Sequence, residues 1–223
     1  MQTLTTLLLD QGLQNHILTD AQLARLIEGS AQRRHSLVNR AIKAGELHRI
    51  RRGLYLLPRR YRDYDCHPFA LAQMLSPGSY ISLETALHYH GWIPEAVYTT
   101  ASIVSGAKSS DLETASMGRF SFRPLAFARG YFLELVSREI VNQQAALVAR
   151  PVRALMDLVC LRKEEWQGLA WFEQSLRIEV EALSAITGDQ LRTLKLCYKH
   201  KRMQRYLGEM EKALGLELGR TGR

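Results

Sequence analysis

Arginine, lysine and amide side chains are concentrated between residues 33 and 62 of this 223-residue chain. This segment holds ten Arg or Lys residues against a single acidic residue, Glu46. In the major groove of DNA, Arg forks onto guanine and Asn or Gln onto adenine, while cations also bind backbone phosphates. These residue types therefore indicate a nucleic-acid site, although a basic face on an isolated helix is more often simply solvated.

A helix predicted from Ser30 to Ala44 places most of these side chains on one face. Residues 37, 38, 41 and 42 are apolar and form one stripe when successive residues are set about 100° apart. The opposite face carries residues able to contact bases and phosphates: Gln32, Arg33, Ser36, Asn39, Arg40 and Lys43.

A β-hairpin is predicted directly after this helix. Two short apolar runs, 47–50 and 54–57, flank a basic turn that contains a glycine. We expect the hairpin to reach phosphates or a narrow minor groove. Its residues assigned to DNA are Arg49, Arg51, Arg52 and Gly53. Tyr55 fits equally well in the core of the hairpin or against the DNA backbone.

Helix-capping residues mark where the elements before the hairpin begin, and the resulting order of elements is that of a known DNA-binding motif. Thr19 and Gln22 have the spacing of a capping box, and Ser30 is suited to cap the basic helix. A further helix is predicted from about residue 3 to 11. Helix, helix, turn, basic helix and hairpin is the order of a winged helix-turn-helix, which we predict for residues 1–62.

Residues 66–223 are predicted to form an α+β domain whose C-terminal part is helical from about residue 161. The predicted helices are 68–75, 83–90 (capped by Ser82) and 151–161. The predicted strands are 80–81, 97–104, 119–122, 131–135 and 140–148. The fold class expected for the whole chain is therefore α+β.

The second domain contains one set of residues that resembles a metal site. Glu84 and His88 lie one helical turn apart, and His90 follows. A metal site would need more ligands at compatible spacing, so we expect capping and core-edge roles and no metal. The common phosphate-loop, dinucleotide, serine-hydrolase and zincin signatures are also missing. We therefore predict no catalytic residue and no cofactor, and a nucleic-acid-processing enzyme is the least favoured reading.

Composition limits the class of protein. The chain is 46% hydrophobic and 23% charged with a net charge of +8, which is typical of a globular protein that binds polyanions. No apolar run is long enough for a membrane span or a signal peptide. Three scattered cysteines do not suggest a disulfide framework. The expected location is the cytoplasm, with no membrane partner.

A second basic cluster lies near the C-terminus, at Lys195, Lys199, Lys201, Arg202 and Arg205. It would add phosphate contacts, attract an acidic or RNA-bound partner, or form a solvated helix face, and the last interpretation is favoured. The aromatic residues of 166–172 are expected to pack inward.

Six blocks of the chain carry a resemblance to a known family: LTDAQL (18–23), RIRRGLY (49–55), PFALA (68–72), PGSYIS (77–82), ALHYHGWIPE (86–95) and ARPVRALMDL (149–158). Together they resemble AbiEi-type antitoxins of toxin–antitoxin and abortive-infection systems. The resemblance covers roughly residues 18–160.

This resemblance implies a winged helix that binds inverted repeats in its own promoter and represses the operon. It also implies that the rest of the chain counteracts a nucleotidyltransferase toxin, with or without direct contact. The implied partners are thus double-stranded operator DNA and the cognate toxin. Residue spacing independently supports only the DNA-binding role. The alternative is a stand-alone winged-helix repressor whose second domain senses a ligand.

Overall fold

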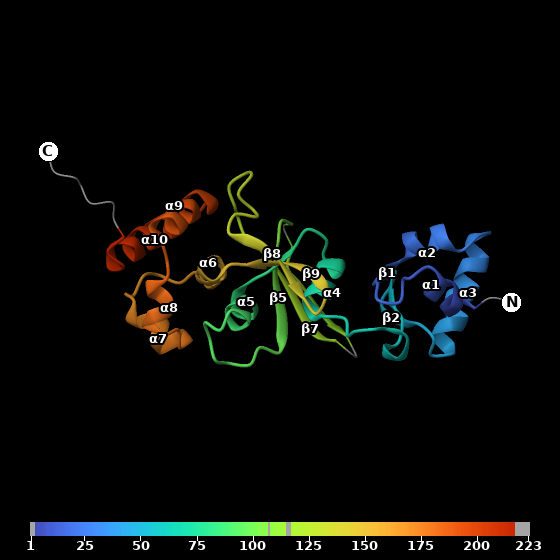
Figure 1. Cartoon of the computed structure of the whole chain (residues 1–223). Coiled ribbons are helices and arrows are strands. Elements are labelled where there is room, and N and C mark those ends of the chain that lie inside the picture. Colours follow the sequence, from blue (N-terminus) through green and yellow to red (C-terminus); the bar gives the residue numbers. More distant parts are fainter. Residues whose placement is uncertain (1–2, 107, 115–116, 217–223) are drawn as a thin grey trace.

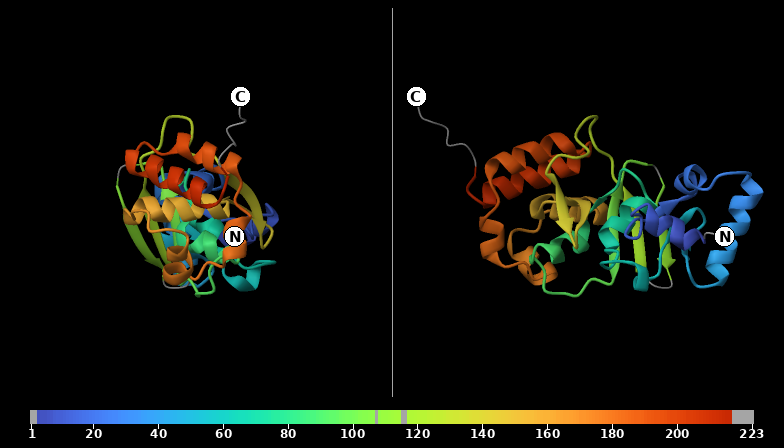
Figure 2. Two further views of the ribbon diagram at one scale, coloured as in Figure 1. Left: turned by 90° about the vertical axis from the view of Figure 1, so that its left-hand side faces the viewer. Right: turned by 45° about the vertical axis from the view of Figure 1, so that its right-hand side comes forward.

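The chain forms an elongated row of three parts in the computed structural model, which describes residues 3–106, 108–114 and 117–216. N-terminal helices lie at one end, a mixed β-sheet in the middle and C-terminal helices at the other end (Figure 1). Figure 2 shows the same order from a second side. None of the described helices is long and apolar enough to cross a membrane.

The N-terminal part combines three helices with a small antiparallel sheet. Its elements are α1 (Leu4–Asp10), β1 (Leu18–Thr19), α2 (Asp20–Leu26), α3 (Ala31–Lys43), β2 (His48–Arg51) and β3 (Leu54–Leu56). The strands are ordered β1-β3-β2, so β2 and β3 form a hairpin and β1 extends it. The predicted helices and hairpin are confirmed, whereas β1 was not predicted.

Side-chain caps fix where α2 and α3 begin. Thr19 Oγ1 accepts from the Gln22 backbone N–H at 3.2 Å, and Gln22 Oε1 accepts from the Thr19 backbone N–H at 2.8 Å. Ser30 Oγ accepts from the Arg33 backbone N–H at 3.2 Å. Both caps confirm the sequence prediction, and each satisfies helix N–H groups that otherwise lack a partner.

Strand β3 is buried on both of its faces. Leu54 and Leu56 belong to the hydrophobic core of the central sheet, whereas Tyr55 and Leu57 belong to the N-terminal core. This follows from the strand geometry, because successive side chains point to opposite sides. The inner strand of the hairpin is therefore shared by both parts.

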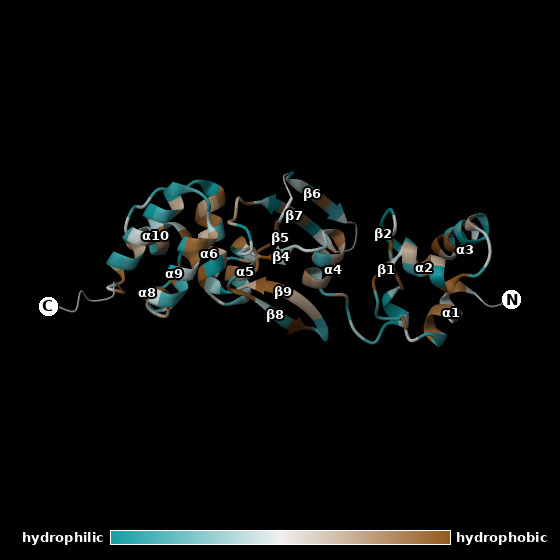
Figure 3. Ribbon diagram, turned by 90° about the horizontal axis from the view of Figure 1, so that it is seen from above, coloured by the Kyte–Doolittle hydropathy of each residue, from teal (hydrophilic) through white to brown (hydrophobic). Residues whose placement is uncertain are grey.

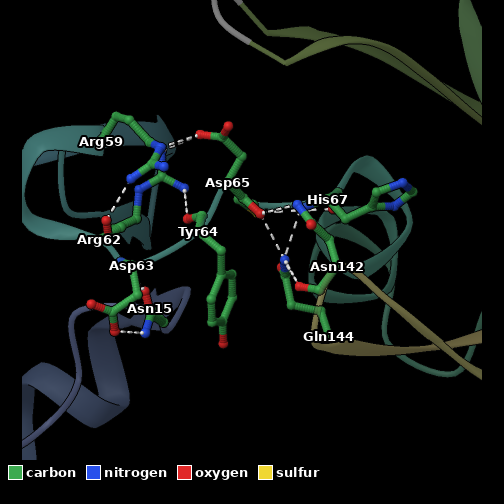
Figure 4. A network of polar contacts seen from close by, with 10 residues as sticks. Asn15, Arg59, Arg62, Asp63, Tyr64, Asp65, His67, Asn142 and Gln144 are labelled. Atoms are coloured by element: carbon green, nitrogen blue, oxygen red, sulfur yellow. Dashed lines mark hydrogen bonds and ion pairs between the residues drawn. The ribbon is translucent and has the colours of Figure 1, made fainter.

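The segment from Asp63 to His67 connects the two parts and is held by hydrogen bonds (Figure 4). The Asp65 carbonyl accepts from Asn142 Nδ2 at 3.1 Å and from Gln144 Nε2 at 2.8 Å. Gln144 Oε1 in turn accepts from the His67 backbone N–H at 3.2 Å. A short 3-10 helix, η1 (Arg59–Tyr61), precedes this connection.

The central part is a six-stranded mixed sheet with three associated helices. Its elements are α4 (Pro68–Leu75), β4 (Tyr80–Ile81), α5 (Leu83–Tyr89), β5 (Thr99–Val104), β6 (Ser110–Thr114), β7 (Gly118–Pro124), β8 (Val136–Val141), β9 (Gln144–Ala149) and α6 (Pro151–Arg162). The strand order is β6-β7-β5-β4-β9-β8, with β4/β9 and β5/β7 parallel. Figure 3 shows β9 largely in brown, as expected for an inner strand. The α+β class is confirmed.

Two strand predictions in this part are wrong. Residues 131–135 form turns, and the carbonyls of Phe132 and Glu134 accept hydrogen bonds from Arg153 instead of a neighbouring strand. Residues 140–148 are not one strand, because Asn142 and Gln143 have φ of 51° and 63° and reverse the chain between β8 and β9. Strand β6 was not predicted at all.

The C-terminal part is helical, as predicted. Its elements are α7 (Ala170–Leu176), α8 (Val180–Ser184), α9 (Gly188–Cys197) and α10 (Lys201–Ala213). Trp166 makes edge contacts with Phe172 and Tyr206, at centroid distances of 6.3 Å and 5.2 Å. These aromatic residues pack inward, which also confirms their predicted role.

A fully buried ion pair within α6 is the centre of a hydrogen-bond network that joins the sheet to the C-terminal part. Arg153 Nε lies 3.0 Å from Asp157 Oδ1, and both side chains are 0% exposed. Tyr80 and Tyr198 donate their hydroxyls to the Asp157 carboxylate at 2.8 Å and 2.7 Å. Ser82 also donates to it, at 2.8 Å, so its hydroxyl does not cap α5 as predicted.

The electrostatics of this network match its hydrogen bonds. Burial and the Asp157 carboxylate raise the pKa of Tyr80 and Tyr198, so both tyrosines stay protonated and donate. Arg153 also gives N–H groups to the Tyr80 hydroxyl and to the carbonyl of Glu134, at 2.8 Å and 3.0 Å. The ion pair is therefore compensated by hydrogen bonds, as a buried pair must be.

The three cysteines are free and buried, and burial raises the pKa of each thiol to about 11. The thiolate is the reactive form, and its fraction at pH 8 is small when the pKa is so high. We expect the native chain to react with iodoacetamide far more slowly at pH 8 than the chain in urea. Mass spectrometry of the labelled cysteines measures both rates, and fast native labelling of any one of them would contradict its placement.

Candidate nucleic-acid interface

The predicted polar face of α3 lies at the surface. Gln32, Arg33, Ser36, Arg40 and Lys43 are exposed, and Asn39 is half-buried. The face is outward because the opposite side of the helix packs into the N-terminal core through Val38 and Ala41. All six predicted residues of this helix therefore share one side of the molecule.

Five exposed basic side chains on α3 and the β2–β3 hairpin have no acceptor within the part of the chain that the structure describes. These free cations are Arg33, Arg40, Lys43, Arg51 and Arg52, and all five are exposed. None of them forms an ion pair with a carboxylate of the described residues. An uncompensated set of this kind has the electrostatics of a phosphate-binding surface.

The arginines after the hairpin have a different role. Arg59 forms an ion pair with Asp65 at 2.8 Å, and Arg60 Nη2 donates to the Gly45 carbonyl at 2.7 Å, near the end of α3. Arg62 is mostly buried and donates to the Tyr64 carbonyl at 3.4 Å. The basic block seen in the sequence thus contains five exposed free cations on α3 and the hairpin, and three arginines after the hairpin that bind a backbone carbonyl or Asp65.

Arg49 is not free either. Its Nη2 donates to Asn39 Oδ1 at 3.2 Å, and its guanidinium carbon lies 5.9 Å from the centre of the Tyr55 ring. Tyr55 is only 5% exposed, which places it in the core. Burial, followed by a hydrogen bond to Asp20, raises the pKa of Tyr55. Arg49 therefore bridges the hairpin and α3.

The turn of the hairpin depends on Gly53, whose φ is 78°. Its carbonyl accepts from the Asp20 backbone N–H at 3.2 Å, and a Cβ here would lie 3.1 Å from Asp20 Oδ2. Its function in the structure is thus to form the turn. The pairing of β2 with β3 is irregular between Arg49 and Arg51, and such a bulge redirects side chains.

No protein-family model matches this chain, and a search among curated proteins finds no match.

The three residues considered for a metal site, Glu84, His88 and His90, have different neighbours and do not meet at one point. Glu84 forms an ion pair with Arg162 at 2.6 Å, and His90 Nε2 lies 2.9 Å from the Ala149 carbonyl. His88 lines a small pocket beside Tyr89. Within the described ranges, no group of three or more His, Cys, Asp or Glu side chains converges as metal ligands would.

The C-terminal basic cluster is also divided by the structure. Lys195 pairs with Glu211. Arg202 donates to the carbonyl of Cys160 in the last turn of α6, at 3.1 Å, and to the carbonyl of Glu164 just after that helix. The remaining members, Lys199, Lys201 and Arg205, are exposed. Only three of the five predicted cations thus face solvent.

A cleft of about 620 Å³ lies beside α5, α6 and α7. Leu83, Leu87 and Ile93 contribute apolar lining. Its charged residues are engaged in ion pairs, including Arg123–Asp111 at 2.7 Å and Arg177–Glu95 at 3.3 Å. The volume is in the range of small-molecule sites, and sequence reasoning missed it because its lining comes from distant segments.

Proposed function

We propose that this chain is a DNA-binding antitoxin of the AbiEi type that represses its own operon. In this proposal residues 1–62 form the winged helix that binds an inverted-repeat operator. The observation that carries the DNA-binding role is the set of five free cations on α3 and the hairpin. They lie on α3 and on the hairpin that directly follows it in the chain. This arrangement would let the helix enter the major groove while the hairpin contacts phosphates.

The antitoxin role rests on the resemblance in residues 18–160 to AbiEi-type proteins. We propose that residues 66–223 counteract a cognate nucleotidyltransferase toxin and have no enzymatic activity of their own. A repressor must reach the chromosome, so the proposed location is the cytoplasm. Toxicity of the neighbouring gene, induced with and without the full chain expressed from an unrelated promoter, tests this role. Failure to rescue growth would remove it.

The DNA-binding role is tested by measuring affinity for a random duplex by fluorescence anisotropy at several salt concentrations. Each phosphate that a cation neutralises contributes about −0.9 to the slope of log K against log salt. If each free cation contacts one phosphate, we expect a slope of about −4.5. A slope near zero would exclude the proposed surface.

A second candidate is a stand-alone repressor with a ligand-sensing second domain. The cleft of about 620 Å³ beside α5, α6 and α7 favours it, because it offers apolar lining with polar edges. A harmless neighbouring gene, together with salt-dependent DNA binding, would favour this candidate over the antitoxin.

A further inference from the structure

The amide of Asn39 is held by side chains from two elements. Its Nδ2 lies 2.8 Å from Nε2 of His35, one helical turn earlier, and its Oδ1 accepts from Arg49 Nη2 at 3.2 Å. A guanidinium and an amide nitrogen both only donate. The amide oxygen must therefore face Arg49, because the opposite orientation would set two donors against each other.

These contacts leave part of the amide available. An amide oxygen accepts up to two hydrogen bonds and an amide nitrogen donates two. With one of each in use, one acceptor and one donor remain. Adenine presents the matching pair in the major groove, since its N6 donates and its N7 accepts.

Arg49 is itself fixed from the other side. It lies opposite Tyr55 across the β2–β3 pair, and Tyr55 is anchored in the core and hydrogen-bonded to Asp20. Arg51 and Arg52, in the same hairpin, make no such contact with a described residue. The two kinds of hairpin arginine are therefore chemically distinct.

We propose that Arg49 is a positioning residue that sets the orientation of the Asn39 amide, and that Asn39 then reads an adenine. This inference rests on the proposed binding of DNA by α3 and the hairpin. It changes the role predicted for Arg49 from a contact with phosphates or a narrow minor groove to a determinant of base preference.

The test is selection of binding sites from a pool of random duplexes with the full chain and with three single variants. Asn39→Ala should lose an adenine preference at one position. Arg49→Ala should lose preference at that same position, by roughly 5- to 150-fold for a lost bidentate contact. Arg51→Ala is the matched control and should keep the preference while binding all sequences more weakly.

Two further readouts separate positioning from a phosphate contact. The variant carrying both Asn39→Ala and Arg49→Ala should discriminate no worse than Asn39→Ala alone, because the two residues act as one unit. The salt slope should fall by about 0.9 in Arg51→Ala but by less in Arg49→Ala. Arg49→Gln supplies a second variant if Arg49→Ala folds poorly. A Gln amide both donates and accepts hydrogen bonds, so it can pair with the Asn39 amide in either orientation.

The outcomes distinguish this inference from the proposed function. If Arg49→Ala keeps the adenine preference and its salt slope falls as in Arg51→Ala, Arg49 is a phosphate contact and the inference is wrong while DNA binding stands. If the unaltered chain binds no duplex at any salt concentration, the proposed function fails and the inference fails with it.

Discussion

Asp157→Ala is expected to lower the free energy of unfolding by about 3–5 kcal/mol, because it leaves the Arg153 guanidinium buried without its counter-ion. The same change removes the acceptor of three hydroxyls, those of Tyr80, Ser82 and Tyr198. Domains of ordinary stability unfold with about 5–15 kcal/mol, so the loss is a large share of the total. Urea denaturation followed by circular dichroism measures it.

Two variants control for the nature of this effect. Glu84→Ala breaks the ion pair with Arg162. The Glu84 and Arg162 side chains are 35% and 42% exposed, so this change should lower the free energy of unfolding by less than about 1 kcal/mol. Replacing the buried pair together, as Arg153→Met with Asp157→Leu, should cost less than Asp157→Ala alone. Equal losses from Asp157→Ala and Glu84→Ala would mean that the pair is not buried as described.

Removing four of the free cations is expected to abolish most DNA binding. The variant combines Arg40→Ala, Lys43→Ala, Arg51→Ala and Arg52→Ala. At about 0.1 M salt, four lost phosphate contacts should weaken the affinity by about 10³-fold, and the salt slope should fall by about 3.6. Anisotropy with a fluorescent duplex measures both quantities, and stability should change little because the side chains are exposed.

A matched control removes four positive charges from the other parts of the chain. The replaced residues are Arg129, Arg138, Lys199 and Lys201. All four are exposed and have no acceptor among the described residues, so their replacement by Ala lowers the net charge equally. This control should retain nearly all affinity. Comparable losses in the two variants would show that binding follows net charge and not the face formed by α3 and the hairpin.

Most local sequence signals predicted the structure correctly, but Ser82 does not cap α5, because its hydroxyl donates to Asp157 instead. The Thr19 and Ser30 caps depend on residues three positions apart, and the hairpin depends on one glycine turn. Sequence reasoning failed at 131–135, where β-rich composition was overruled by contacts with Arg153. It also missed the buried network, because Tyr80 and Tyr198 lie 77 and 41 residues from Asp157 in the sequence.

The candidate site was predicted in residue type but not in the role of each residue. The apolar stripe of α3 was enough to show which side chains face outward. Spacing alone did not distinguish the free Arg51 from Arg49, which contacts Asn39, or from Arg60, which contacts Gly45. That distinction depends on where acceptors from other elements lie, and only the folded chain provides it.

The two-sided burial of β3 determines how the chain can be divided. A fragment ending at residue 62 would present Leu54 and Leu56 to water, and a fragment starting at residue 66 would lose the cover that these leucines provide. Each fragment would expose a hydrophobic surface and would therefore tend to self-associate. Point substitutions in the intact chain therefore separate the roles of the two ends more cleanly than truncation does.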